Sequence, residues 1–104
     1  MSSKYVGIPT SDGGLFDAYV SMPVRKQAPG VVMIPEIFGI NEGLRRCADL
    51  FARQGFAVLA PDIFWRLGRN VELDYSEASY KKAFALHRAF DYEQGVADMA
   101  NAFL

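Results

Sequence analysis

Two uninterrupted apolar runs, separated by a stretch with helical spacing, constrain the fold of this chain most strongly. Residues 31–34 read VVMI and residues 56–60 read FAVLA. Apolar runs that do not alternate with polar residues are typical of β-strands covered on both faces. We therefore predict that both segments are central, parallel strands of an α/β protein.

The stretch between these runs has the pattern of a capped amphipathic helix. Its apolar residues recur at the spacing of one helical face, namely Leu44, Cys47, Ala48 and Phe51. Asn41 can cap the start of the helix, and Gly55 suits the left-handed position after its end. The three segments together predict a β-α-β unit with a right-handed crossover. The same spacing predicts that Cys47 is a small buried core residue.

The segments that flank this unit predict a hairpin before it and two helices after it. Residues 4–9 and 15–22 read as strands joined by TSDGG, and residues 23–30 form a polar loop. Residues 61–76 read as a loop, and a helix capped by Ser76 or Ser79 follows. Its expected inner face is Tyr80, Ala83, Phe84, His87 and Phe90. Asp91 and Gln94 form a capping box for a third helix. The inner face expected for that helix is Tyr92, Val96, Met99, Ala100 and Phe103.

Composition narrows the function classes. The chain has 104 residues with a net charge of -1, and apolar residues make up 51% of it. These values predict one globular domain and disfavour nucleic acid or a membrane surface as partners. One cysteine cannot form an internal disulfide, and the first residues lack a long apolar leader, so we expect a cytoplasmic protein. We expect neither a bound metal nor a cofactor.

Glu36 stands out because it follows an apolar strand directly. Ligands of open α/β sheets bind where the strands end at their carboxyl side, so Glu36 is placed for chemistry. The other interpretation is a carboxylate that caps a helix or accepts hydrogen bonds from loop amides. The backbone amides from Ile37 onward could donate to an anion in the same cleft.

Three strings carry a family resemblance: IPEIFGIN, GFAVLAPDIFWR and FDYEQGVADM. Together they resemble the N-terminal part of the dienelactone hydrolase family, esterases of the α/β-hydrolase fold. The resemblance implies the N-terminal half of that fold, with about four strands in the order 1-2-4-3. It also implies an antiparallel first pair, one helix on one face and the C-terminal helices on the other. Residues 1–104 would then be one partial domain that stops before the nucleophile elbow.

The resemblance also assigns roles to residues. Glu36 matches the acid that contacts the catalytic thiol and governs its ionisation, and Ile37 matches the residue whose N–H lines the oxyanion hole. The family's nucleophile elbow, with a later Asp and His, has no counterpart here, because the sequence contains no Gly-x-Cys-x-Gly or Gly-x-Ser-x-Gly. We therefore expect this chain alone to be inactive.

The candidate substrate contacts are Phe38, Tyr80, Phe84 and His87. Tyr80 stands where members that open dienelactones carry an arginine that holds the substrate carboxylate, which disfavours dienelactone itself. His87 has three interpretations: a packing role on its helix, a cleft-lining role, or metal ligation. The last is disfavoured because no second ligand stands three or four residues along.

Two functions remain at this point. The first is an ester or lactone hydrolase, acting on a small molecule through a Cys or Ser nucleophile absent from this segment. The second is a non-catalytic half-sheet that associates through an exposed strand edge at residues 31–35, as a homodimer or by a segment swap. Unpaired backbone groups at a strand edge invite such pairing.

Overall fold

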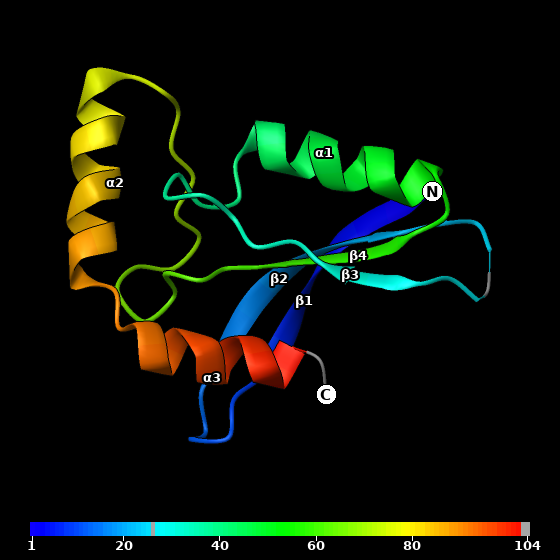
Figure 1. Cartoon of the computed structure of the whole chain (residues 1–104), viewed down its shortest axis with the longest axis horizontal. Helices are drawn as coiled ribbons and strands as arrows, with labels where there is room; N and C mark the ends of the chain where they lie inside the picture. The colour runs from blue at the N-terminus through cyan, green and yellow to red at the C-terminus, as the bar shows by residue number, and fades with distance from the viewer. Residues whose placement is uncertain (26, 103–104) are drawn as a thin grey trace.

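The computed structural model describes residues 1–25 and 27–102 and shows an α/β protein built on one mixed sheet (Figure 1). In chain order the elements are β1 Ser2–Pro9, β2 Leu15–Met22, β3 Gly30–Val32, α1 Glu42–Arg53, β4 Ala57–Pro61, α2 Glu77–Ala89 and α3 Tyr92–Ala102. The sheet order is β1-β2-β4-β3. This order and the antiparallel first pair confirm the predicted architecture.

The N-terminal hairpin forms because its turn satisfies its own backbone. The Thr10 N–H donates to the Gly14 carbonyl at 2.9 Å, and the Gly14 N–H donates to Thr10 Oγ1 at 2.8 Å. Gly13 adopts a φ of 90°, which costs a glycine little. Pro9 is thereby set opposite Leu15, and the register continues to Ser2 opposite Met22.

The predicted β-α-β unit is present, but its first strand is not central. β3 pairs in parallel with β4, and α1 connects them over one face of the sheet. β3 is parallel to β4 as predicted, but it is an edge strand whose valines are only half-buried, so the prediction that it is central is wrong. The physical reason is that β4 is its only neighbour among the described residues, and no described strand pairs with its outer edge.

Helix α1 begins at its predicted cap but is rotated from its predicted orientation. Asn41 Oδ1 accepts a hydrogen bond from the Leu44 N–H at 3.0 Å, as its position in the sequence predicted. The buried residues of the helix are Ala48 and Ala52, and these small side chains bring it close to the sheet. Cys47 is exposed, which makes the prediction of a buried cysteine wrong. The rotation brings Asp49 toward β2, where two hydroxyl groups bind it.

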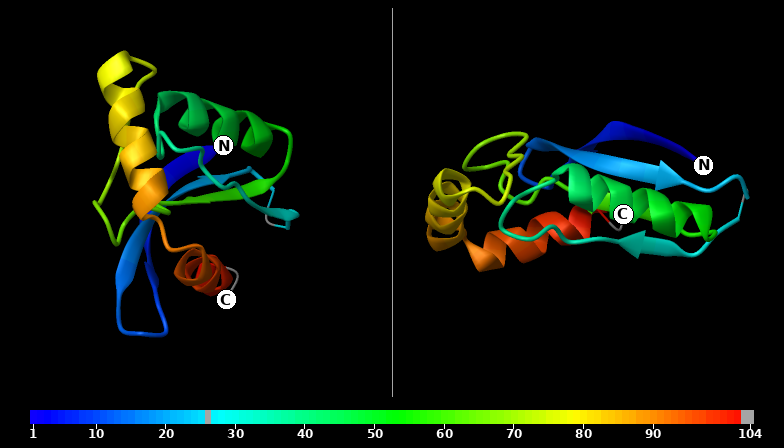
Figure 2. Two further views of the ribbon diagram at one scale, coloured as in Figure 1. Left: turned by 60° about the vertical axis from the view of Figure 1, so that its left-hand side comes forward. Right: turned by 90° about the horizontal axis from the view of Figure 1, so that it is seen from above.

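The last two helices follow their predicted caps. Ser76 Oγ accepts from the Ser79 N–H at 3.3 Å, and Asp91 Oδ1 accepts from the Gln94 N–H at 3.1 Å. Figures 1 and 2 show α1 and α3 on opposite faces of the sheet, with α2 standing beyond the carboxyl ends of β3 and β4. Helices therefore cover both faces, as predicted.

The inner faces of α2 and α3 differ from the prediction. The only buried residue of α2 is Ala83, whereas His87 is exposed. In α3 the buried residues are Gly95 and Asp98, and the side chains of Tyr92 and Val96 are 62% and 70% exposed. Gly95 lies against the Phe90 ring, and Asp98 accepts a buried hydrogen bond from Trp65, so α3 packs through its polar side. Phe103 lies outside the described residues.

None of the helices described within residues 1–25 and 27–102 is long and apolar enough to cross a lipid bilayer.

Candidate active site at the carboxyl end of strand β3

The segment between β3 and α1 is folded by a tight turn at Gly39. The Glu36 carbonyl accepts a hydrogen bond from the Gly39 N–H at 3.1 Å. Gly39 has a φ of 75°, and a Cβ atom at this position would collide with the Val71 carbonyl oxygen. Only glycine meets both conditions, so this residue fixes the path of the backbone on either side of Glu36.

A second segment, residues 71–75, holds this turn in place. The Leu73 N–H donates to the Phe38 carbonyl at 2.9 Å, and Asn41 Nδ2 donates to the Leu73 carbonyl at 3.1 Å. Arg45 adds an ion pair with Glu72 and donates to the Ile40 carbonyl at 3.0 Å. The loop that carries Glu36 is thus bound to the loop before α2.

Glu36 is exposed and lies where two cavities meet. One cavity, of about 390 Å³, lies between β3, α2 and α3, and the other, of about 290 Å³, lies beside α1. The sequence placed this carboxylate at the mouth of an apolar strand, and the structure leaves it accessible there. It lies in the loop that follows β3, one of the two edge strands of the sheet.

The larger cavity is mostly apolar and carries few polar groups. Its apolar walls include Ile34, Ile37, Phe64, Phe90, Val96 and Met99. The polar side chains that reach it are those of Glu36, His87 and Tyr92. The Tyr92 hydroxyl lies 3.4 Å from His87 Nδ1, so the two side chains meet at the join between α2 and α3. This join is where the exposed His87 reaches the cavity.

Cys47, the only thiol of the sequence, lines the smaller cavity together with Glu36. The lining of this cavity also includes Asn41 and Tyr75. Cys47 reaches it because of the rotation of α1 described above. Sequence spacing missed this proximity, since it assigned Cys47 to the buried face of the helix.

The remaining predicted contacts form an aromatic cluster. Phe38 is buried, and its ring centre lies 4.7 Å from that of Tyr75 and 5.0 Å from that of Tyr80. Phe84 continues the cluster along α2, with its ring centre 6.3 Å from that of Tyr80. The structure therefore brings Glu36, Ile37 and His87 to one cavity, and places Phe38, Tyr80 and Phe84 in this cluster.

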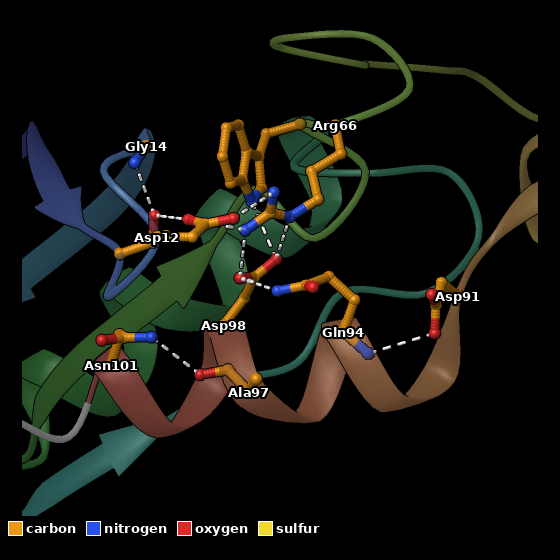
Figure 3. Close-up of polar contacts among 10 residues, drawn as sticks. Asp12, Gly14, Arg66, Asp91, Gln94, Ala97, Asp98 and Asn101 are labelled. Carbon is orange, nitrogen blue, oxygen red and sulfur yellow. Dashed lines mark hydrogen bonds and ion pairs between the residues drawn. The ribbon is translucent and has the colours of Figure 1, made fainter.

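A charge network around the buried Asp98, which sequence reasoning missed, fixes the helix that lines the larger cavity (Figure 3). Asp98 on α3 accepts hydrogen bonds from Arg66, Trp65 and Gln94. Arg66 also forms an ion pair with Asp12 in the hairpin turn at 3.0 Å. Burial acts to raise the pKa of Asp98, but the hydrogen bonds from its three partners outweigh this and lower it. The charged residues lie far apart in the sequence, and no local pattern connects them.

Comparisons with known proteins agree with this architecture. Residues 16–103 match the model of the dienelactone hydrolase family. Carboxymethylenebutenolidase 1 of Cupriavidus pinatubonensis is 41% identical over 103 residues, which are 98% of this chain and 44% of that protein. Carboxymethylenebutenolidase of Pseudomonas putida is 35% identical, with the same coverage of both proteins. The chain thus spans less than half the length of these curated relatives.

A solved structure shows the same partial coverage. The crystal structure of a "putative dienelactone hydrolase" from Klebsiella pneumoniae superposes with a TM-score of 0.79 and 25% identity. The superposition covers 97% of this chain and 41% of that one. The sequence match and the shared architecture lead to one assignment. The chain belongs to the dienelactone hydrolase family.

Proposed function

We propose that this chain supplies the acid and one oxyanion donor of an active site that hydrolyses carboxylic esters or lactones. The observation that carries the proposal is the placement of Glu36 and Ile37. They are consecutive residues in the loop that follows β3 at its carboxyl end, and both border the apolar cavity. The Ile37 N–H donates to no acceptor within residues 1–25 and 27–102, so it is available to an anion. The name of these relatives, carboxymethylenebutenolidase, supports the same chemistry.

The reaction would need a thiol or hydroxyl nucleophile from polypeptide outside residues 1–104. The nucleophile, after losing its proton, would attack the acyl carbon, and the Ile37 N–H would help to hold the negative charge on the carbonyl oxygen. Collapse of this intermediate would expel the alcohol, which takes up a proton, and water would then hydrolyse the acyl-enzyme. Glu36, as a neighbouring anion, would disfavour the thiolate and so control when the nucleophile ionises.

This chain alone is expected to hydrolyse p-nitrophenyl acetate no faster than the buffer does. Cys47 is the only thiol, and it lies on a helix rather than on a strand-to-helix turn. Turnover by the wild-type chain that Cys47→Ala abolishes would contradict this expectation and make Cys47 a nucleophile.

A fusion protein tests the proposed roles directly. Residues 1–104 would replace the matched part of the Cupriavidus carboxymethylenebutenolidase 1, and ester hydrolysis would be measured against pH. We expect Glu36→Gln to change the pH dependence of kcat/KM, because the amide removes the charge that influences the nucleophile. Glu93→Gln, at an exposed position on α3, is the matched control and should leave the profile unchanged. An unchanged profile in both variants would exclude Glu36 from the reaction.

The oxyanion role has its own variant. Ile37→Pro removes the N–H, and loss of one such donor typically lowers kcat by about 10²- to 10³-fold. Ile37→Val keeps the N–H and should retain activity within a small factor. Thermal unfolding of both fusion variants would separate loss of the donor from loss of the fold. Equal activity in the two variants would assign the oxyanion donors to other residues.

A further inference from the structure

Asp62 is a buried carboxylate that the proposed chemistry does not use. It follows β4 directly, and only 3% of its surface is exposed. No lysine or arginine within residues 1–25 and 27–102 forms an ion pair with it. Burial of an ionised group without a cation is costly unless hydrogen bonds compensate for it. The groups that bind its oxygens therefore indicate what this side chain does.

The partner of this carboxylate is the backbone of Asn70, eight residues along the chain. The Asn70 N–H donates to Asp62 Oδ2 at 2.8 Å. Asn70 has a φ of 56°, and it is the only residue other than glycine with a positive φ in the described part of the chain. This left-handed conformation costs free energy for any residue with a Cβ atom. Burial raises the pKa of Asp62, and the hydrogen bond from Asn70 acts against this. The bond therefore holds residue 70 in a conformation that most residues avoid.

The residues that follow Asn70 hold the loop of the candidate active site. Glu72 forms an isolated antiparallel bridge with Gly39. The Leu73 N–H donates to the Phe38 carbonyl at 2.9 Å. Because both contacts come within three residues of Asn70, the conformation of residue 70 determines how this segment meets the loop after β3.

A short path of bonded backbone joins Asp62 to the Ile37 N–H. Two residues separate Asn70 from Leu73, and the Phe38 that Leu73 binds is next to Ile37. Leu73 and Phe38 are also buried in one apolar cluster, against which Ile37 packs. An oxyanion donor is effective only when it is aimed at the position of the developing charge, and a displacement of about 1 Å can cost about 10²-fold in rate.

A cavity of about 360 Å³ lies on the other side of this segment. Asp17, Asp62 and residues 70–72 line it. Side chains do not fill this space, so packing does not hold residues 70–72 from that side. The hydrogen bond to Asp62 supplies the missing restraint, in addition to the ion pair between Arg45 and Glu72. Asp17 is half-buried in the same cavity but does not bind the residue 70 backbone.

We propose that Asp62 is a positioning residue for the candidate active site. It fixes the backbone at Asn70, and through residues 71–73 it fixes the direction of the Ile37 N–H. The proposal rests on the oxyanion role of Ile37 that is part of the proposed function. Asp62 itself would touch no substrate, since it lines neither of the two cavities that meet at Glu36.

Amide hydrogen exchange in the chain alone tests the structural link. We expect Asp62→Ala to accelerate exchange of the Asn70 and Leu73 N–H groups at least about tenfold, because loss of the hydrogen bond releases the segment. Asp62→Asn keeps an acceptor oxygen at the same distance from the backbone and should retain the protection. The Met33 N–H, which donates to the Leu59 carbonyl in the sheet, is the internal reference and should not change. Unchanged protection of Leu73 in Asp62→Ala would overturn the proposal.

The fusion with the Cupriavidus protein tests the effect on catalysis. Asp62→Ala should lower kcat by about 10- to 100-fold with little change in KM, because an oxyanion donor acts mainly in the transition state. Asp62→Asn should restore most of kcat. Asp17→Asn removes a carboxylate from the same cavity without removing the bond to Asn70, so it is the matched control and should leave kcat unchanged. An equal loss in Asp62→Ala and Asp62→Asn, or a rise in KM alone, would overturn the positioning role.

A double-mutant cycle separates this proposal from the proposed function. If Asp62 acts through the Ile37 N–H, Asp62→Ala should cost little more in the Ile37→Pro background. Full additivity would overturn the positioning role. Full activity in Ile37→Pro alone would refute the oxyanion role instead, whereas the exchange rates would still show whether Asp62 holds the segment.

Thermal unfolding of the variants shows whether Asp62→Ala folds. If it does not, Asp62→Glu takes its place in each experiment, since it keeps the charge but moves the acceptor by the length of a methylene group. The same losses are expected. Exchange and kcat equal to those of the wild type in Asp62→Glu would overturn the proposal, because the charge alone would then be sufficient.

Discussion

Arg66 donates hydrogen bonds to both oxygens of the Asp98 carboxylate. Its Nη2 atom lies 2.9 Å from Asp98 Oδ1, and its Nε atom lies 3.0 Å from Asp98 Oδ2. Trp65 Nε1 donates to the same Oδ2 atom at 3.1 Å. This pair joins α3 to the loop after β4, and α3 makes only sparse contacts with the sheet itself. A bidentate, charge-assisted interaction of this kind is geometrically specific as well as strong.

We predict that Asp98→Asn loosens α3 and lowers the free energy of unfolding by about 2 kcal/mol. The amide removes the charge that Arg66 requires and turns an N–H group toward a donor. The value is below that of a fully buried pair, because the Arg66 side chain is 32% exposed. Urea unfolding would measure the change, with Glu93→Gln on the same helix as the control. Equal stabilities would mean that apolar contacts alone hold α3.

The charge network of Asp98, Arg66 and Asp12 should also affect how the stability of the chain depends on pH. Hydrogen bonds from Arg66 and Thr10 lower the pKa of Asp12 from 3.8 to about 2, and the pKa of Asp98 is also lowered. A lowered carboxyl pKa stabilises the folded state above the unfolded value, and this contribution disappears as the pH falls through the folded value. Asp62 acts oppositely: burial raises its pKa, so its protonation on acidification favours folding.

We therefore expect the wild-type chain to lose stability between about pH 4 and pH 2, and Arg66→Gln to lose less over this interval. The variant retains part of the loss, because Ser76 and Ser79 lower the pKa of Asp74 to about 2 independently of Arg66. The measurement is the urea midpoint at several pH values. Arg46→Gln, which removes an exposed i,i+4 pair with Glu42, should follow the wild type. Identical curves for Arg66→Gln and wild type would contradict the assignment.

The sequence predicted the elements well because their signals are local. Asn41, Ser76 and Asp91 cap helices through their own side chains, and TSDGG closes a hairpin within a few residues. The rotation of each helix about its own axis was harder to predict, because its apolar residues were assumed to face the core. In α3 that assumption failed because the buried Asp98 is bound by Arg66, a partner 32 residues away in the sequence. Such a pairing has no periodic signature.

The candidate site was predicted in part. The end of the apolar run at residues 31–34 predicted that Glu36 and Ile37 follow a strand at the carboxyl edge of the sheet, and both residues line the larger cavity. His87 lines a cavity, whereas Phe38, Tyr80 and Phe84 form an aromatic cluster. This difference depends on how α2 packs against residues 36–41 and 71–75. That packing is tertiary, so helical spacing could not separate His87 from Tyr80. The roles of all these residues remain predictions.

A half-buried carboxylate contact between β2 and α1 gives a third prediction. Asp49 Oδ1 accepts hydrogen bonds from the hydroxyl groups of Tyr19, at 2.9 Å, and Ser21. Asp49→Ala leaves both buried hydroxyls without this acceptor, so it should cost about 2 to 3 kcal/mol, more than Tyr19→Phe at about 1.5 kcal/mol. Once Asp49 is alanine, Tyr19→Phe should add little, because the bond is already lost. Full additivity in this double-mutant cycle, measured by urea unfolding, would show that the bond does not contribute.

The turn at Gly39 gives the last prediction, because it links stability to the position of Glu36. Gly39 and Gly13 both have positive φ values, 75° and 90°, but only Gly39 has a backbone oxygen, that of Val71, where a Cβ would lie. Gly13→Ala should therefore cost about 1 kcal/mol, from the backbone conformation alone. Gly39→Ala should cost at least about 3 kcal/mol, because the loop must also move away from Val71. Urea unfolding would give both values, and equal costs would show that residues 36–41 can shift without resistance from the loop they contact.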